Sequence, residues 1–253
     1  MRQKRRKDFG KEKKVGLARA LSKMGFCSRS EAVELIRAGR VKLNGVVKKN
    51  AETPVRVGRD AIQVDGKNAK AAEKVYCMLN KPRGIVTTAE DEQGRETVYA
   101  LLPAGTPWMG PVGRLDKASE GLLLLTNDTE WAALVTAPES HLDKTYHAQI
   151  GAVADDSLLE KLEAGVVDGE EKLKAKRVML LRAGEKNSWL EIVLDEGKNR
   201  QIRRMLEACG VEVLRLIRVA IGPLALGDLA KGKSRVLSRE EIHMLDSAKH
   251  SRD

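Results

Sequence analysis

A single acidic residue stands out in this sequence because of what surrounds it. Asp116 lies between Gly113 and Gly121, and four consecutive leucines follow at 122–125. A short apolar run bounded by turn residues is typical of a strand that is buried on both faces. Glycines let the backbone turn tightly and let another molecule come close. An ordinary surface turn before a core strand would have the same spacing, but the pattern also fits a carboxylate held at the mouth of a rigid strand, where a substrate can reach it.

The segments around this acid predict an α+β domain with a mainly antiparallel mixed sheet and flanking helices. Several of its strand pairs are joined too closely to leave room for crossover helices. The predicted strands cover residues 75–79, 122–126, 144–150, 175–181, 188–194 and 211–219, and the predicted helices cover 129–136, 155–164 and 199–208.

A smaller unit is predicted before it, made of two helices and a short sheet. Apolar residues recur at helical spacing from Leu17 to Met24, and a second helix begins after Ser28, which has Glu31 at the capping-box position. Asn44-Gly45 between two apolar pairs then predicts a hairpin. The complete division is a basic arm at 1–14, a small domain at 15–66, a linker at 67–74, a larger domain at 75–240 and a polar tail at 241–253.

The positive charge of the chain is concentrated in this first part. Residues 1–74 carry a net charge of +13 and residues 75–253 a net charge of −3, out of a total of +10. Such asymmetry indicates a module that binds a polyanion, attached to a body with another task. Phosphate contacts with release of counterions would supply the affinity.

Composition disfavours several other classes of function. No apolar run approaches the roughly 20 residues that cross a bilayer, so no membrane partner is expected. The three cysteines are far apart, which is typical of a protein of the reducing cytoplasm. No Cys/His cluster predicts a metal site, and no glycine-rich phosphate loop predicts a nucleotide cofactor.

Two resemblances make these expectations more specific. The first unit resembles the alpha-L RNA-binding module, through residues 27–30, 32, 35–36, 39–41, 44–45 and 62–66. The second resembles the pseudouridine synthases that act on bacterial small- and large-subunit ribosomal RNA. Its motifs are Leu79-Asn80-Lys81-Pro82-Arg83-Gly84, Gly113-Arg114-Leu115-Asp116, the segment 121–128, Lys144-Thr145-Tyr146 and the segment 196–205. Ala118, Ser119 and Lys198 depart from the family pattern without touching the carboxylate.

The second resemblance implies a reaction and a set of site residues. A uridine already in RNA is isomerised: its N1–C1′ bond breaks, the uracil turns, and C5 joins C1′, with no cofactor and no metal. Asp116 would be the essential residue, and the sequence leaves open whether it attacks C1′, attacks C6 or removes a ribose proton. All three roles require an ionised carboxylate, which a cationic neighbour stabilises. The family pattern assigns that role to Arg203, as an ion pair, and assigns stacking on the uracil to Tyr146.

Further residues are predicted to bind the RNA. Arg114 would fill the gap left by a flipped nucleotide, and Leu216 would form an apolar floor, although core packing alone would explain it. Phosphate contacts are predicted for Lys198, Arg200 and Arg204, and contacts of the N-terminal unit with RNA for Arg29, Arg37, Arg40 and Lys42.

Alternatives remain at the level of the sequence. The chain could be a non-catalytic ribosome-assembly factor, a methyltransferase, or a retaining glycosidase in which Glu120 or Asp128 donates a proton to complement Asp116. Among RNA substrates, the motifs favour ribosomal RNA of the large subunit, with the small subunit as the alternative. The substrate is naked RNA or an assembly intermediate, and the enzyme is expected to be a cytoplasmic monomer.

Overall fold

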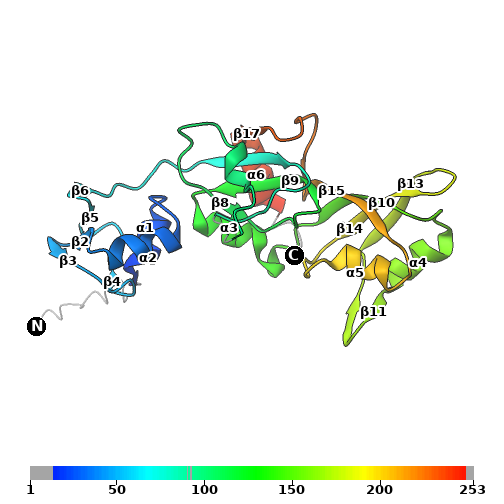
Figure 1. Cartoon of the computed structure of the whole chain (residues 1–253), viewed down its shortest axis with the longest axis horizontal. Helices are drawn as coiled ribbons and strands as arrows, with labels where there is room; N and C mark the ends of the chain where they lie inside the picture. The colour runs from blue at the N-terminus through cyan, green and yellow to red at the C-terminus, as the bar shows by residue number, and fades with distance from the viewer. Residues whose placement is uncertain (1–13, 90, 92, 249–253) are drawn as a thin grey trace, which may run out of the picture. The chain divides into compact units, whose positions relative to one another are not determined.

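The computed structural model describes residues 14–89, 91 and 93–248. The chain divides into two compact units (Figure 1): the first runs to Lys74 and includes residues 107–109, and the second comprises the remaining residues from 75 onward. Apart from Lys14, the predicted basic arm lies outside the described residues, as do residues 249–253 of the predicted tail.

In the first unit, two helices and short strands share one apolar core. Leu21 of the first helix, Ile36 of the second and Val41 of the sheet are all fully buried there. Ser28 caps the second helix by accepting a hydrogen bond from the Glu31 amide, as the capping pattern predicts. The elements are β1 (Val15–Gly16), α1 (Leu17–Lys23), α2 (Arg29–Arg37), β2 (Val41–Leu43), β3 (Val46–Val47), β4 (Pro54–Val55), β5 (Ile62–Val64) and β6 (Lys67–Asn68).

The strand order of the small sheet is β3-β2-β5-β6. Asn44 and Gly45 join β2 to β3 with positive φ at both positions, which is the geometry that such a two-residue hairpin requires. β6 pairs with β5, so the linker predicted from residue 67 begins inside the sheet.

The second unit is built on a mixed sheet. Its elements are β7 (Tyr76–Lys81), η1 (Val98–Leu101), β8 (Gly110–Val112), β9 (Glu120–Thr126), α3 (Thr129–Thr136), η2 (Pro138–Ser140), β10 (Lys144–Ile150), α4 (Asp156–Ala164), β11 (Val166–Asp168), β12 (Glu171–Leu173), β13 (Arg177–Ala183), β14 (Ser188–Leu194), α5 (Gln201–Glu207), β15 (Val213–Ile221), β16 (Leu224–Ala225), β17 (Ser234–Val236) and α6 (Arg239–Ala248). The α+β architecture predicted from the sequence is confirmed.

One parallel pair joins the two halves of this sheet. The order is β13-β14-β10-β15-β9-β7-β17, and β9 with β15 is its parallel pair among the described strands. The pair has only two steps, Ile217 with Glu120 and Arg218 with Gly121. Beyond it, β8 pairs with β9 while β15 continues beside β10 and β16. The sheet therefore splits just after Gly121.

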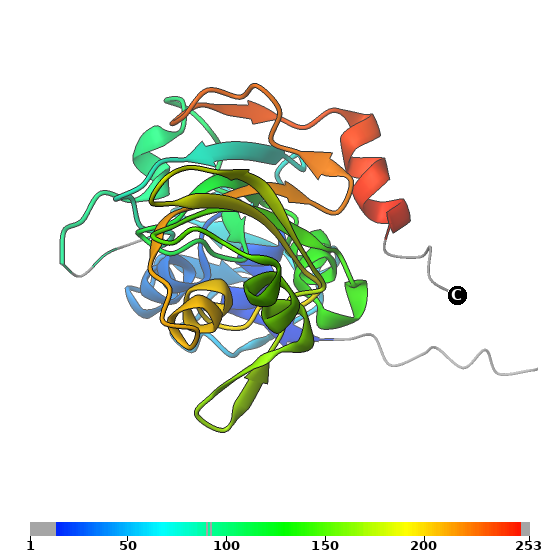
Figure 2. The same cartoon turned by 90° about the vertical axis from the view of Figure 1, so that its right-hand side faces the viewer.

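Each half of the sheet has its own core. In one half, α4 and α5 pack on β10, β13, β14 and β15, and fully buried Leu162, Leu190 and Leu206 lie between them. In the other half, α3 and α6 pack on β7 and β9 around Leu122, Leu124 and Leu245. Figure 2 shows α6, in red, beside β16 at the edge of this second half.

The presence of α6 corrects the prediction of a polar tail from residue 241. Ser238 and Glu241 form a reciprocal capping box at its first turn, and Leu245 is fully buried. In the part of the chain that the structure describes, no helix is long and apolar enough to cross a membrane.

Candidate active site

The predicted site lies where the sheet splits. A glycine at the start of β9 lets β15 approach it closely. A Cβ added to Gly121 would lie 2.2 Å from the carbonyl oxygen of Arg218, and the φ of Gly121 is +100°. Only glycine adopts that conformation without strain and leaves room for the neighbouring backbone. β15 is thereby brought against the start of β9, and the loop that carries Asp116 directly precedes this contact.

A fully buried lysine holds the loop in place. Lys81 ends β7, and its Nζ donates hydrogen bonds to the carbonyl oxygens of Pro82 at 3.1 Å, Asp116 at 3.0 Å and Ser119 at 2.8 Å. Burial lowers the pKa of Lys81 to about 8, although the charges of Asp116 and Glu120 act in the opposite direction. Three acceptors around one nitrogen match the three donors of an ammonium group.

The carboxylate of Asp116 itself is left available. It is partly buried, and within the described residues no side chain or amide forms a hydrogen bond or ion pair with it. The predicted ion pair with Arg203 is therefore not formed at contact distance. Arg203 instead donates from Nη2 to the carbonyl oxygen of Ala118 at 3.1 Å and from Nη1 to that of Val213 at 3.3 Å.

The charge of Asp116 nevertheless reaches Arg203 through space. Burial lowers the pKa of Arg203, the positive charges of Arg200 and Arg83 lower it further, and the negative charge of Asp116 opposes them. Arg83, Arg200 and Arg203 therefore lie near enough to one another to interact electrostatically. Arg200 occupies the left-handed region, with φ of 49°, at the start of α5. A strained arginine at the rim of such a group is consistent with binding an anion there.

Tyr146 lies across the sheet from these groups. It is partly buried on β10, and its partners in register are Ile192 on β14 and Arg218 on β15. Residues directly opposite each other share a face of the sheet, so Tyr146 and Arg218 lie together. Leu216, 6 % exposed, belongs to the adjacent core that Tyr146 packs against. Core packing therefore accounts for Leu216, and a role as pocket floor stays a prediction.

The two carboxylates that a glycosidase would need are engaged elsewhere. Glu120 is 3 % exposed and forms ion pairs with Arg215 at 2.7 Å and Lys231 at 2.6 Å. Burial raises its pKa, but the hydrogen bonds and charges of the two cations outweigh this and lower it. Asp128 caps α3 and accepts a hydrogen bond from the Tyr76 hydroxyl. Neither acid is placed as the proton donor that a glycosidase would need in addition to Asp116.

Comparisons with known proteins show the family of the chain. A family described as RNA pseudouridylate synthase matches residues 75–208, and the S4 domain family matches residues 15–62. The chain belongs to the RNA pseudouridylate synthase family. It is 39 % identical to the ribosomal large subunit pseudouridine synthase B of Bacillus subtilis, over 90 % of this chain and 94 % of that protein. It is 38 % identical to an uncharacterized RNA pseudouridine synthase of Aquifex aeolicus, over 92 % of this chain and 94 % of that protein. A crystal structure of a pseudouridylate synthase superposes with a TM-score of 0.65 at 29 % identity, covering 91 % of this chain and 99 % of that one.

For a pseudouridylate synthase, the predicted phosphate ligands differ in availability. Arg204 forms ion pairs with Asp168 and Glu171 of the β11–β12 hairpin. Lys198 lies 3.6 Å from a carboxylate oxygen of Glu196. By contrast, Arg200 and Arg114 are exposed, and neither side chain forms a hydrogen bond or ion pair within the described part of the chain. Arg200 and Arg114 are therefore better placed to bind RNA than Arg204, whose contacts favour holding α5.

The S4 domain of this pseudouridylate synthase shows the same contrast. Arg40 donates two hydrogen bonds to Asp65, and Arg29 pairs with Glu52 at 3.3 Å. Arg37 and Lys42 are exposed, and their side chains form no hydrogen bond or ion pair among the described residues. Of these four predicted residues, Arg37 and Lys42 thus have charges available to an outside anion.

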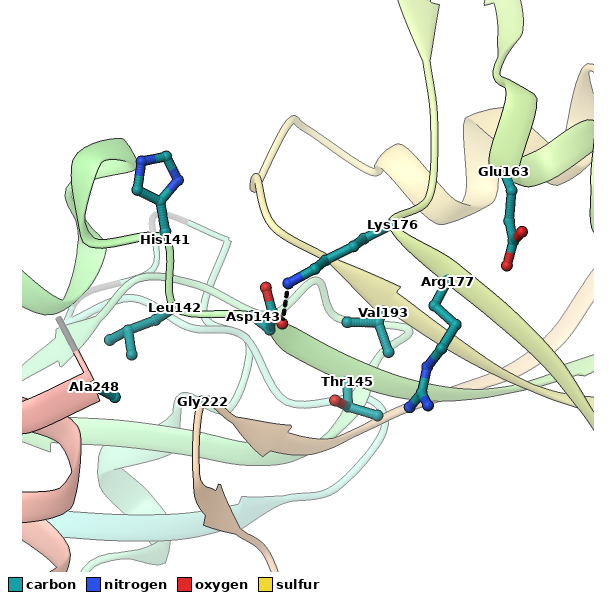
Figure 3. Close-up of a pocket in the computed structure, with 10 residues that line it drawn as sticks. All are labelled: His141, Leu142, Asp143, Thr145, Glu163, Lys176, Arg177, Val193, Gly222 and Ala248. Atoms are coloured by element: carbon teal, nitrogen blue, oxygen red, sulfur yellow. Dashed lines mark hydrogen bonds and ion pairs between the residues drawn. The ribbon is translucent and has the colours of Figure 1, made fainter. Parts of the chain in front are cut away.

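A cavity of ≈ 610 Å³ lies elsewhere on the synthase unit (Figure 3). The ion pair between Asp143 and Lys176 crosses it at 2.6 Å, with His141 on one side and Arg177 on the other. Thr145 lines it, and Thr145 lies on the opposite face of β10 from Tyr146 because successive strand residues alternate. The cavity is therefore separate from the predicted site.

Sequence reasoning gave no role to two residues of this synthase site. Lys81 lies within a motif of the family, but nothing in its spacing predicts that it is fully buried beneath the Asp116 loop. Arg218 is 6 % exposed and donates from Nε to the carbonyl oxygen of Leu122 at 2.7 Å. The signal in the sequence was an arginine inside an apolar strand, a position at which a buried charge needs a partner.

Proposed function

We propose that this RNA pseudouridine synthase isomerises a specific uridine in ribosomal RNA of the large subunit, with Asp116 as the essential residue and no cofactor. The observation that carries the assignment of Asp116 is its unengaged carboxylate on a loop held by Lys81 and faced by Arg203. The carboxylates of Glu120 and Asp128, by contrast, are engaged in ion pairs or in capping a helix.

The reaction is balanced within the uridine. The N1–C1′ bond breaks, C5 forms the new bond to C1′, and the proton on C5 leaves while N1 gains one, so substrate and product are isomers. No electron acceptor or co-reactant is consumed. The partial burial of Asp116 and Tyr146 suits a base that has left its helix, because a stacked base is out of reach of both.

The choice of RNA rests on the relatives and on charge. The Bacillus subtilis relative is named for the large ribosomal subunit, and the first unit carries the excess of positive charge that structured RNA attracts. Residues 15–66 would hold the RNA through Arg37 and Lys42, while residues 75–240 carry out the isomerisation. Small-subunit ribosomal RNA is the alternative substrate.

The test is tritium release from ribosomal RNA labelled with [5-³H]uridine, using wild type and Asp116→Asn. Wild type should release tritium from large-subunit RNA, and Asp116→Asn should release none while binding the RNA with nearly unchanged affinity. Release from small-subunit RNA alone would reassign the substrate. No release from either RNA, free or partly assembled, would favour a binding role, and equal loss of binding and turnover in the variant would contradict the role of Asp116.

A further inference from the structure

The arginine at the split of the sheet has a donor that the protein does not use. Nε of Arg218 binds the carbonyl oxygen of Leu122, but Nη2 is buried and has no acceptor within the part of the chain that the structure describes. Buried donors in folded proteins almost always have a partner. A guanidinium group that is 6 % exposed and only partly satisfied is therefore one to which a ligand can add an acceptor.

The hydrogen bond from Nε of Arg218 to Leu122 has a structural role. Leu122 lies where β9 exchanges one neighbour for another: β15 pairs with Glu120 and Gly121, and β8 pairs from Leu124 onward. Its carbonyl oxygen falls in the gap between these neighbours. Nε of Arg218 donates to this oxygen in place of a strand neighbour, and Nη2 takes no part in this hydrogen bond.

The position of Arg218 indicates where the ligand would be. It is the register partner of Tyr146 on β10 and of Gly121 on β9, so it lies between the predicted stacking residue and the strand that follows Asp116. Lys144 is also close: burial lowers its pKa, and the charge of Arg218 lowers it further, against the opposing charges of Asp143 and Asp195. No carboxylate forms an ion pair with Arg218 among the described residues. The unused donor thus points to an oxygen-rich ligand.

We propose that Nη2 of Arg218 donates a hydrogen bond to a carbonyl oxygen of the target uracil while the ring lies against Tyr146. This inference rests on the proposed function. Uracil brings two carbonyl oxygens into the site when its nucleotide is flipped out. A phosphate is a poorer match, because moving its charge out of water into this buried part of the sheet costs more than moving a neutral base, and the exposed Arg200 is available to it at the surface.

The hydrogen bond would act on the chemical step more than on affinity. When the N1–C1′ bond breaks with its electron pair on the base, negative charge spreads onto the uracil carbonyls. A fixed donor in a water-poor site stabilises such developing charge. It would also hold one end of the ring while the uracil turns to present C5.

The decisive variant is Arg218→Lys, because one ammonium can still donate to the Leu122 carbonyl but cannot also supply the second donor at the same place. Tritium release is measured with enzyme in excess over large-subunit RNA, together with the enzyme concentration for half-saturation and the thermal unfolding midpoint. We expect the saturated rate to fall about 100-fold, with half-saturation within twofold of wild type and an unfolding midpoint close to it. Arg235→Lys is the matched control. Arg235 lies on the edge strand β17 and forms an ion pair with Glu241 of α6, so its replacement should leave the rate unchanged.

Three outcomes would overturn the proposal. An Arg218→Lys variant with the rate of wild type would show that Arg218 has a structural role only. A variant with an unchanged saturated rate but a higher enzyme concentration for half-saturation would indicate a phosphate contact. If Arg218→Lys does not fold, wild type is compared on RNA with 2-thiouridine or 4-thiouridine at the modified position, since sulfur accepts hydrogen bonds weakly; full rates with both would also overturn it. A wild type that releases no tritium would instead reject the proposed function itself, and is recognised before any variant is made.

Discussion

The side chain of Lys81 and the backbone of Asp116 are joined by a hydrogen bond of 3.0 Å, although the two residues are 35 positions apart. The same nitrogen also binds the carbonyl oxygens of Pro82 and Ser119, so the loop is held both at Asp116 and at Ser119. The loop has no helix or strand of its own at Asp116. Its geometry therefore depends on contacts from other segments: Lys81 binds the carbonyl oxygens of Asp116 and Ser119, and Arg203 binds that of Ala118.

Replacement of Lys81 by methionine should impair catalysis while leaving RNA binding largely intact. Methionine fills similar space but donates no hydrogen bond, so the Asp116 loop would shift, and a displacement of about 1 Å at a reacting group can cost about 100-fold in rate. Tritium release and filter binding measure the two effects. Lys176→Met, which breaks an ion pair at the separate cavity, is the control. An unchanged rate in Lys81→Met would show that the loop is held by other contacts.

Lys81 should also make stability and activity respond to pH in opposite directions. Burial lowers its pKa to about 8 from the ordinary 10.5. The folded chain then binds fewer protons than the unfolded chain between these values, so the contribution of Lys81 to the free energy of unfolding rises with pH across that window, by about 3 kcal/mol. Below pH 8 both states are protonated and the full cost of burying the charge remains. The neutral amine can donate only two of the three hydrogen bonds, so the rate should decline above pH 8.

Urea unfolding at pH 7.5 and pH 10 tests the stability part of this prediction. Wild type should gain stability relative to Lys81→Met between the two values, because only wild type has the titrating group. A difference between the two proteins that stays constant with pH would contradict it. The decline of the rate is followed in the same buffers by tritium release.

Gly121→Ala should be strongly destabilising. The added methyl group would lie 2.2 Å from the Arg218 carbonyl oxygen and 2.8 Å from its amide nitrogen, both backbone atoms, at a φ that disfavours a side chain. We expect a loss of more than about 3 kcal/mol in the free energy of unfolding. Gly105→Ala is the control, since Gly105 also has positive φ but has open space around it, and it should cost about 1 kcal/mol. Equal losses would mean that the close approach of β9 and β15 carries no constraint.

The charges of the S4 domain can be separated by the salt dependence of RNA binding. Arg37→Ala with Lys42→Ala should reduce the slope of log affinity against log salt by about 0.7–0.9 for each phosphate that is no longer neutralised. Arg40→Ala removes the same charge as either, but Arg40 is already paired with Asp65 and should change the slope less. Binding to a labelled RNA fragment is measured between about 50 and 200 mM salt. A larger effect from Arg40 would reverse the assignment.

The regular parts of the fold could be predicted from local pattern. The strands 144–150 and 188–194 and the helix 129–136 have the predicted bounds, because their apolar spacing is strong and their ends carry clear signals. α6 was missed because its composition is polar and it buries little beyond Leu245. Its capping box of Ser238 and Glu241 was a signal in the sequence that could have found it.

The sequence predicted which residue types form the candidate site but not which contacts they make. Asp116, Tyr146 and Arg203 were chosen from motifs, yet their mutual arrangement depends on pairs far apart in the chain. Arg204 illustrates the difference: its acids come from a hairpin 33 and 36 residues earlier, and no local pattern shows that they face it. The partners of Lys81 and Arg218 lie up to 38 and 96 residues away in the same manner.

The short parallel contact between β9 and β15 has a consequence for how the enzyme is made. Glu120 meets Arg215 across 95 residues, and Ala118 meets Arg203 across 85. Local hairpins can form as the polypeptide leaves the ribosome, but this junction has to wait until nearly all of the second unit has emerged. A nascent chain that ends before β15 would lack Arg218 and the backbone that packs on Gly121. Catalytic competence is therefore expected to arise all at once, after β15 has emerged, so that copies that end before it stay inert.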